Sequence, residues 1–120
     1  MKVILSIIAF SIFSIFDIGE DIATALKQGK HQELYKHLDE KIIVKILDKE
    51  DLLSKEQCTA NLSAFFEKNP IRQFQLIQNT VLSPTAQFVY GIIETPSNKY
   101  KLSILIKKSS IVQLRIDYYE

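Results

Sequence analysis

Three tyrosines and two phenylalanines are the side chains best suited to line a binding site: Tyr35, Phe74, Phe88, Tyr90 and Tyr100. Each tyrosine joins an apolar ring to a polar hydroxyl. Ligand pockets are lined mainly by apolar and aromatic side chains with a few polar groups. If the elements that carry these residues leave an open hollow, the five predict a site for a small apolar ligand. The alternative is that they only complete the hydrophobic core.

Four acidic residues offer a different chemistry: Asp39, Asp48, Glu94 and Asp117. For catalysis, ketosteroid isomerase uses a carboxylate in an apolar pocket with a tyrosine as hydrogen-bond donor. Tyr35, Tyr90 or Tyr100 could be that donor here. The four acids fall at strand ends, in turns or at outward-facing positions, where a charge stays solvated. An isomerase or dehydratase with a buried carboxylate is therefore the second hypothesis, behind a non-catalytic binding domain.

Cysteine and histidine give little support for nucleophilic or metal chemistry. His31 and His37 are six residues apart and do not share a helix face, so they form a poor metal pair. Cys58 suits a packing position in the first turns of a helix. The sequence has no G-x-S-x-G motif and no glycine-rich phosphate loop. We therefore predict no catalytic, cofactor-binding or metal-binding residues and no cofactor.

Three helices are predicted: Asp17–Gln28, His31–Leu38 and a helix that Ser54 caps and Asn69-Pro70 ends. Asp17 with Glu20 and Ser54 with Gln57 each have the spacing of a capping box. The third helix has apolar residues at helical spacing from Cys58 to Phe66, which indicates one face directed to the core.

Five strands follow from alternating patterns: Lys41–Leu47, Ile71–Leu82, Ala86–Thr95, Lys99–Lys107 and Ile111–Tyr119. The charged segment Asp48–Asp51 is predicted to be a turn. In the last strand Val112, Leu114, Ile116 and Tyr118 are expected to face inward. Short connections between the last four strands favour antiparallel hairpins. The fold class is therefore α+β, with N-terminal helices packed on a curved antiparallel sheet.

The segment Phe88–Ile93 is apolar on both faces, unlike its neighbours. We expect it to be an interior strand whose outer face is covered by another molecule. Gly91 within it suggests a bend or bulge. A homodimer through the outer face of the sheet is the partner that this pattern favours.

The N-terminus has the layout of a secretory signal peptide in residues 1–16. Lys2 precedes an apolar run that ends before Asp17. An uncleaved membrane anchor is the alternative. We expect an exported protein, periplasmic or extracellular, with membrane contact only through this segment and a single domain in residues 17–120. Removing Lys2 lowers the 15 basic residues to 14, against 14 acidic ones. This balance does not favour a nucleic-acid partner.

Five sequence motifs, in order, carry a resemblance to a known family: Asp21-Ile22-Ala23-x-Ala25-Leu26-Lys27-x-Gly29, Ser54-Lys55-x-Gln57, Ala64-Phe65-Phe66-x-x-Asn69-Pro70, Tyr90-Gly91-Ile92-Ile93-x-Thr95 and Leu114-Arg115-Ile116. The chain resembles the bacterial domain of unknown function family 4783, which comprises small exported proteins. The resemblance implies a cone-shaped nuclear transport factor 2-like fold, related to cystatin-like sheets. It implies no activity and no functional residue. We therefore expect an exported non-catalytic domain that binds a small apolar ligand or a protein partner.

Overall fold

A computed structural model of the protein describes residues 17–120. The predicted signal peptide, residues 1–16, lies outside the described residues. The helices are α2 (Ile18–Lys27), the 3₁₀ helix η1 (His31–His37) and α3 (Lys55–Lys68). The strands are β1 (Leu38–Ile46), β2 (Lys49–Ser54), β3 (Gln73–Ser83), β4 (Ala86–Glu94), β5 (Lys99–Lys107) and β6 (Ser110–Tyr118). None of the helices in this part of the chain has the length and apolar character needed to cross a membrane.

The helices begin and end where the capping signals place them. The Asp17 carboxylate accepts a hydrogen bond from the Glu20 backbone N–H at 2.9 Å. A complete capping box opens α3, because the Ser54 hydroxyl accepts from the Gln57 N–H and the Gln57 side chain accepts from the Ser54 N–H. Gly29 follows α2 with φ +73°, a left-handed conformation that glycine adopts without strain.

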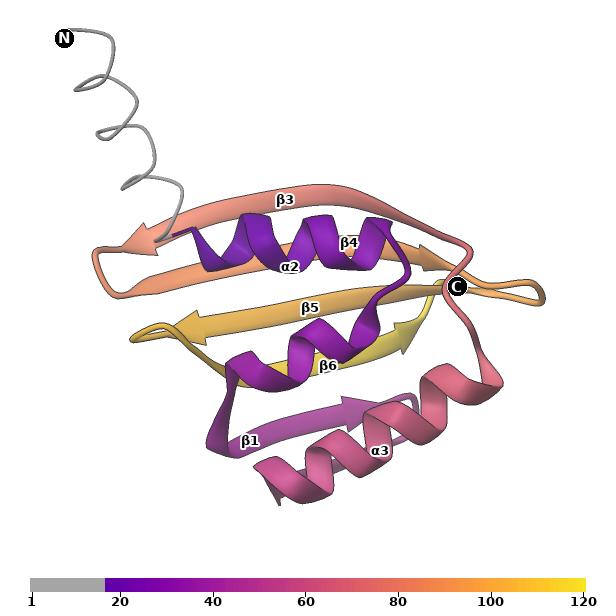
Figure 1. Cartoon of the computed structure of the whole chain (residues 1–120), viewed down its shortest axis with the longest axis horizontal. Helices are drawn as coiled ribbons and strands as arrows, with labels where there is room; N and C mark the ends of the chain where they lie inside the picture. The colour runs from indigo at the N-terminus through magenta and orange to yellow at the C-terminus, as the bar shows by residue number, and fades with distance from the viewer. Residues whose placement is uncertain (1–16) are drawn as a thin grey trace, which may run out of the picture.

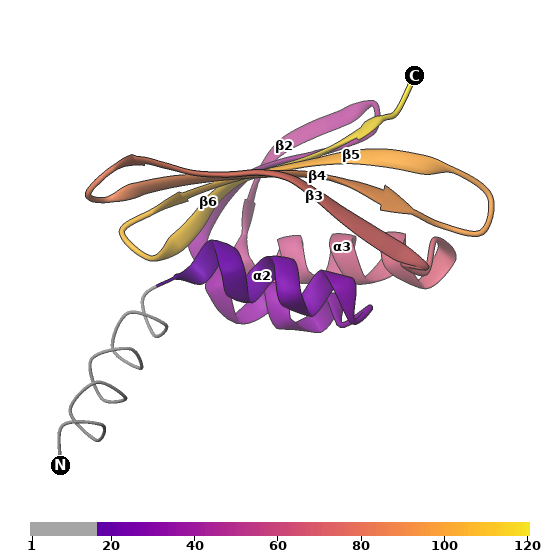
Figure 2. The same ribbon diagram turned by 90° about the horizontal axis from the view of Figure 1, so that it is seen from above.

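The six strands form one curved sheet in the order β2-β1-β6-β5-β4-β3. All helices of the described chain lie against one face of this sheet, and the other face is left open (Figures 1 and 2). Helices packed on one face of a curved sheet are the α+β arrangement that the sequence predicts and that the family resemblance implies. The sheet is mixed, however, because β1 pairs with β6 in parallel. The predicted antiparallel sheet therefore contains one parallel pair.

Strand β2 is the element that the sequence prediction missed. The segment Asp48–Asp51 was predicted to be a turn, but the turn is confined to Leu47 and Asp48, and Leu47 has φ 58°. The following residues pair with β1 in an antiparallel ladder. β2 has only one neighbour, so its charged side chains remain in water. Charges therefore do not prevent strand formation at a sheet edge.

Two of the irregularities in strand pairing concern residues at the core face. In β6, Leu105 pairs with Gln113 and Ile106 with Ile111, so Val112 is an extra residue. Ile111 is consequently buried in place of Val112, and Tyr118, predicted to face inward, is 50% exposed at the strand end. The second bulge lies in β3, across from Gly91 and not at that glycine. Gly91 instead allows the Phe74 ring to pack directly on the β4 backbone.

Apolar side chains of the helices meet the inner face of the sheet and form one core. The fully buried members include Ile22, Leu26, Leu34, Leu62 and Phe66 from the helices and Ile42, Ile93, Leu102, Ile104, Leu114 and Ile116 from the strands. β4 is an interior strand, as predicted, since β3 and β5 pair with it on either side. Hollows on the surface of the described chain lie at both ends of the sheet and between α2 and η1.

Candidate functional site

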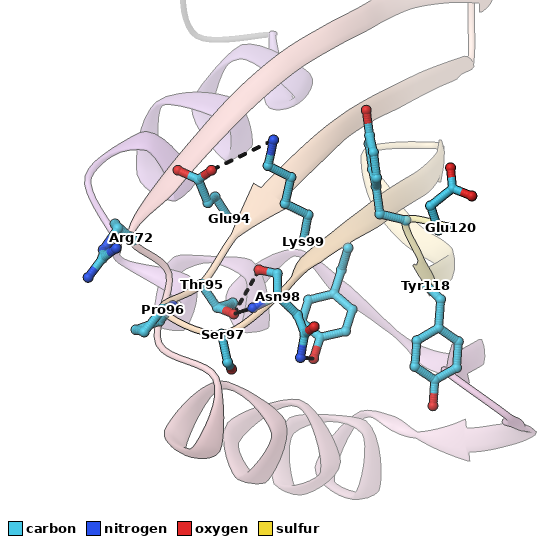
Figure 3. Close-up of a pocket in the computed structure, with 11 residues that line it drawn as sticks. Arg72, Glu94, Thr95, Pro96, Ser97, Asn98, Lys99, Tyr118 and Glu120 are labelled. Atoms are coloured by element: carbon cyan, nitrogen blue, oxygen red, sulfur yellow. Dashed lines mark hydrogen bonds and ion pairs between the residues drawn. The ribbon is translucent and has the colours of Figure 1, made fainter.

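One hollow of the described chain lies at one end of the sheet and has a volume of about 690 Å³. It opens between the turn that joins β4 to β5 and the C-terminal end of the chain (Figure 3). The residues that line it are Arg72, Glu94, Thr95, Pro96, Ser97, Asn98, Lys99, Tyr100, Tyr118, Tyr119 and Glu120. We call this site the end hollow. Its lining combines aromatic rings, a proline and four charged side chains.

A tight turn over residues 95–98 forms one wall of the end hollow. The Thr95 N–H and hydroxyl both donate to the Asn98 carbonyl oxygen, at 2.8 Å and 2.9 Å. The Asn98 N–H donates to the Thr95 hydroxyl oxygen at 3.0 Å. Thr95 is 4% exposed and is the one buried polar residue in the described range 17–120. Because the Thr95 N–H and hydroxyl are paired within the turn, the turn has a defined shape before any ligand binds.

Tyr100 connects this turn to the end of α3. Its hydroxyl donates to the Asn69 side-chain oxygen at 3.3 Å and accepts from the Asn98 side-chain amide at 3.5 Å. Asn69 in turn donates to the Phe65 carbonyl oxygen at 3.0 Å. The Tyr100 ring also packs edge-on against the Phe65 ring, with centroids 5.2 Å apart. The wall of the hollow is therefore fixed to the hydrophobic core.

The C-terminal tyrosines provide the opposite, more exposed wall. Tyr118 and Tyr119 are 50% and 46% exposed. The Tyr118 hydroxyl donates to Asp48 at 3.4 Å, and the Asp48 charge raises the pKa of Tyr118. Lys99 lies 5.6 Å from the centre of the Tyr119 ring, at cation–π distance.

The charges at the rim are unevenly paired. Lys99 and Glu94 form an ion pair at 3.8 Å. Arg72 is exposed, and within the described range its side chain takes part in no ion pair. Its backbone N–H donates to the Glu94 carbonyl oxygen at 2.8 Å, which anchors Arg72 beside the turn. Arg72 is therefore the cation that is available to bind an anionic or polar group of a ligand.

The structure does not bring the five predicted pocket residues together. Tyr100 lines the end hollow. Phe74 is 4% exposed in the core, and Tyr35 hydrogen-bonds His31 near α3. Phe88 and Tyr90 alternate with the buried Val89 along β4, so they lie on the open outer face. A period of two places them on the face opposite Tyr100, Phe74 and Tyr35.

The four acids of the isomerase hypothesis are also separated. Asp117 pairs with Lys45 on the outer face, and Glu94 pairs with Lys99 at the rim of the end hollow. Asp39 is partly exposed and Asp48 is exposed. None of the four is buried, and Glu94 alone reaches the end hollow.

The remaining candidates have packing roles. Cys58 is fully buried, and burial raises its pKa to about 11. His31 stacks on Phe66 with ring centroids 4.9 Å apart, and burial lowers the His31 pKa. Burial likewise raises the pKa of Tyr35, to about 12. Residues 17–120 contain no group of three or more His, Cys, Asp or Glu side chains placed to bind a metal ion.

Sequence reasoning missed most of the end hollow. It gave no role to the connection between β4 and β5, and it did not single out Arg72. Arg72, the turn of residues 95–98 and Tyr119 are separated from one another by more than 20 positions in the sequence. The available signal was the clustering of Tyr118 and Tyr119 at the end of a strand, beyond the reach of the core.

Comparison with known proteins identifies the kind of domain. A family model described as "Domain of unknown function (DUF4783)" matches residues 19–117. The chain is similar to the solved DUF4783 family protein from Bacteroides uniformis ATCC 8492, with TM-score 0.79 and 26% identity, covering 86% of this chain and 98% of that one. It is also similar to the one from Bacteroides ovatus ATCC 8483, with TM-score 0.76 and 27% identity, covering 82% and 93%.

A designed protein supports the fold assignment. The design, named "Rd1NTF2_04 with long sheet", matches with TM-score 0.64 and 14% identity, covering 81% of this chain and 94% of that one. At this identity the likeness concerns the fold alone. A search of curated proteins finds no match to this chain.

Proposed function

The chain belongs to the DUF4783 family, whose model covers residues 19–117, and from this premise we propose that it is an exported, non-catalytic binding domain. The observation that carries the proposal is the end hollow, a preformed site with aromatic walls. Ligand sites of this kind combine apolar surface with a small number of polar groups that set the orientation of the ligand.

The lining of the end hollow indicates the class of ligand. Tyr118, Tyr119 and Pro96, which are exposed, offer apolar surface for a small, mostly apolar molecule. Arg72 stands at the rim without an ionic partner among the described residues. A ligand with an apolar ring system and one anionic or polar end fits this arrangement. The ring system would lie against the tyrosines and the polar end would lie beside Arg72.

Enzymatic action of the isomerase type would require an acid in an apolar pocket, because desolvation is what keeps such a carboxyl group protonated or basic at neutral pH. Thr95 is the one buried polar residue of the described chain. Asp39, Asp48, Glu94 and Asp117 are exposed or partly exposed. Their positions support binding as the role of this domain.

Fluorescence titration with 1-anilinonaphthalene-8-sulfonate, an aromatic probe with one anionic group, tests the ligand proposal. We expect saturable binding to the folded protein. A Tyr118→Ala/Tyr119→Ala variant should lose most of the affinity, and Arg72→Ala should weaken it. The matched controls are Tyr90→Ala on the outer face and Arg115→Ala, whose side chain pairs with Glu50. Equal losses in the controls and the hollow variants would contradict the proposal.

Export is the second part of the proposal and rests on the apolar run that precedes Asp17. Expression of the full chain in a bacterium, followed by fractionation, tests it. We expect the product in the periplasm or medium, shortened at its N-terminus. Recovery of the full-length chain from the cytosol would contradict export. An uncleaved product in the membrane fraction would favour the anchor.

The outer face of the sheet is where the sequence predicts a second copy. Phe88, Tyr90 and Ile92 lie there, half-buried, and no helix of the described chain covers them (Figure 2). On the neighbouring half of this face the charged side chains already pair with one another, Lys45 with Asp117 and Arg115 with Glu50. This leaves the β4 side as an apolar surface for a homodimer. A Tyr90→Lys variant tests this prediction from the sequence in sedimentation: loss of the dimer would support a second copy on this face, and an unchanged mass would contradict it.

A further inference from the structure

Strand β3, Gln73–Ser83, ends the sheet at one edge, and no strand of the described chain lies beyond it (Figure 1). Its sequence, QFQLIQNTVLS, contains no charged residue, no proline and no glycine. Of the whole chain 24% is charged, so two or three charges would be expected in these 11 residues. Such an edge offers unpaired backbone groups to another strand.

The opposite edge of the same sheet shows the contrast. Strand β2 has six residues, and Lys49, Glu50 and Asp51 among them are charged and exposed. Short length and charge are the usual devices that prevent strand addition at an edge. β3 has neither device, and its pairing with β4 shifts register at two points, between Leu76 and Gln78 and between Val81 and Ser83.

Exposed apolar side chains accompany this open edge. Ile77, Val81 and Leu82 are 52%, 72% and 57% exposed. Three of the seven large apolar residues that are exposed in the described range therefore lie on this one strand. The pattern is that of a surface for strand addition, in which backbone hydrogen bonds supply affinity.

Helix α2 lies along the same rim and carries charges of both signs. It packs more extensively on β3 than on β4 (Figure 1). Asp21 and Gln28 line a shallow depression toward η1. At 100° per residue, Glu20 and Lys27 lie about 100° around α2 from Asp21 and Gln28, on the side away from η1. Both are exposed, with the acid near the start of α2 and the base at its end.

We propose that a second copy of this chain adds to the β3 edge, with the two β3 strands antiparallel about a two-fold axis. This arrangement joins two six-stranded sheets into one. It also places the two α2 helices antiparallel, so that Glu20 of each copy faces Lys27 of the other. The assembly closes at two copies, because each chain has one uncharged edge and the β2 edges are charged. This inference does not depend on the proposed ligand site.

The size of the contact predicts a modest affinity. Eleven strand residues extend about 36 Å, at about 3.3 Å per residue. With the adjoining helix, the two copies together would bury about 1,000 Å², near the lower limit of a specific interface. We therefore expect a dimer in the micromolar range.

Analytical ultracentrifugation of the purified product of the full chain tests the inference. We expect a monomer–dimer equilibrium, and Ile77→Lys/Val81→Lys should raise the dissociation constant at least tenfold. The matched control is Leu52→Lys on β2, where the side chain is 65% exposed; it should leave the equilibrium unchanged. A protein that stays monomeric at about 100 μM would overturn the inference.

A charge swap tests the antiparallel helix pair without touching the sheet. Glu20→Lys and Lys27→Glu should each weaken the dimer several-fold, and the double swap should restore it. A double swap no better than either single variant would overturn the arrangement. A dimer lost in Tyr90→Lys but kept in the β3 variant would place the interface on the outer face instead. If the β3 variant fails to fold by circular dichroism, the charge swap decides the question.

Discussion

Replacement of Phe66 by alanine tests whether α3 and the sheet share one core. Phe66 is 2% exposed, stacks on His31 at 4.9 Å and meets the Phe65 ring edge-on at 5.3 Å. Burial of a phenylalanine side chain stabilises a fold by about 1.5–3 kcal/mol. Deleting the ring leaves roughly 100 Å³, which at about 24 cal/mol per Å³ adds up to about 2.4 kcal/mol when the site does not collapse. We expect a total loss of about 3–5 kcal/mol.

Urea denaturation followed by circular dichroism measures this loss. The control is Phe88→Ala on the outer face, which removes the same atoms from a half-buried site and should cost less than about 2 kcal/mol. An NMR titration of His31 gives a second readout. Burial lowers the pKa of His31, so removal of the stacked ring should raise that pKa toward 6.5. Near-equal losses in the two variants, with an unchanged His31 pKa, would refute the assignment of the α3 face.

Three further predictions concern caps, protons and close packing. Ser54→Ala removes the side-chain half of the α3 capping box and should cost about 1 kcal/mol in urea denaturation; an unaltered midpoint would contradict this. Burial is the main cause that lowers the pKa values of His31 and His37 below 6.5. The unfolded chain therefore binds protons first as the pH falls, and the free energy of unfolding, fully present above 6.5, should decrease below it. Urea-denaturation midpoints that stay constant between about pH 7.5 and about pH 5.5 would argue against this linkage between protonation and stability. Gly91→Ala would bring a methyl group within 2.6 Å of the Phe74 ring and should cost at least about 2 kcal/mol; a wild-type melting temperature would show that the β4 backbone has room.

The helices could be predicted well because their signals are local. Asp17 and Ser54 accept the hydrogen bonds that their spacing predicts. Their helices end at Gly29 and Asn69, where the chain can no longer continue in helical geometry. Pairing of strands is different, since it depends on residues that are distant in the sequence. The parallel contact of β1 with β6 and the edge strand β2 have no local signal of that kind.

The register of the sheet explains the errors in side-chain direction. The extra residue at Val112 shifts the alternation in β6, so that Ile111 enters the core. A one-residue change of register turns every following side chain to the other face. The sequence showed that β4 is apolar on both faces but gave no means to decide which face the helices cover. Tyr90 and Tyr100 were therefore assigned to one pocket although they lie on opposite faces.

The end hollow could not be predicted because it is made where three chain segments meet. Arg72 precedes β3, Thr95 begins the β4–β5 turn, and Tyr119 follows β6. Only the strand order brings these positions together. The aromatic residues in the sequence indicated a binding role but not where in the fold the binding site lies.

NMR mapping with 1-anilinonaphthalene-8-sulfonate is the direct test of ligand binding at the end hollow. We expect saturable chemical-shift changes at the amides of Arg72, of the turn of residues 95–98 and of the C-terminal residues 118–120, with little change elsewhere. Shifts that cluster on the outer face around Tyr90, or the lack of any saturable shift, would contradict it.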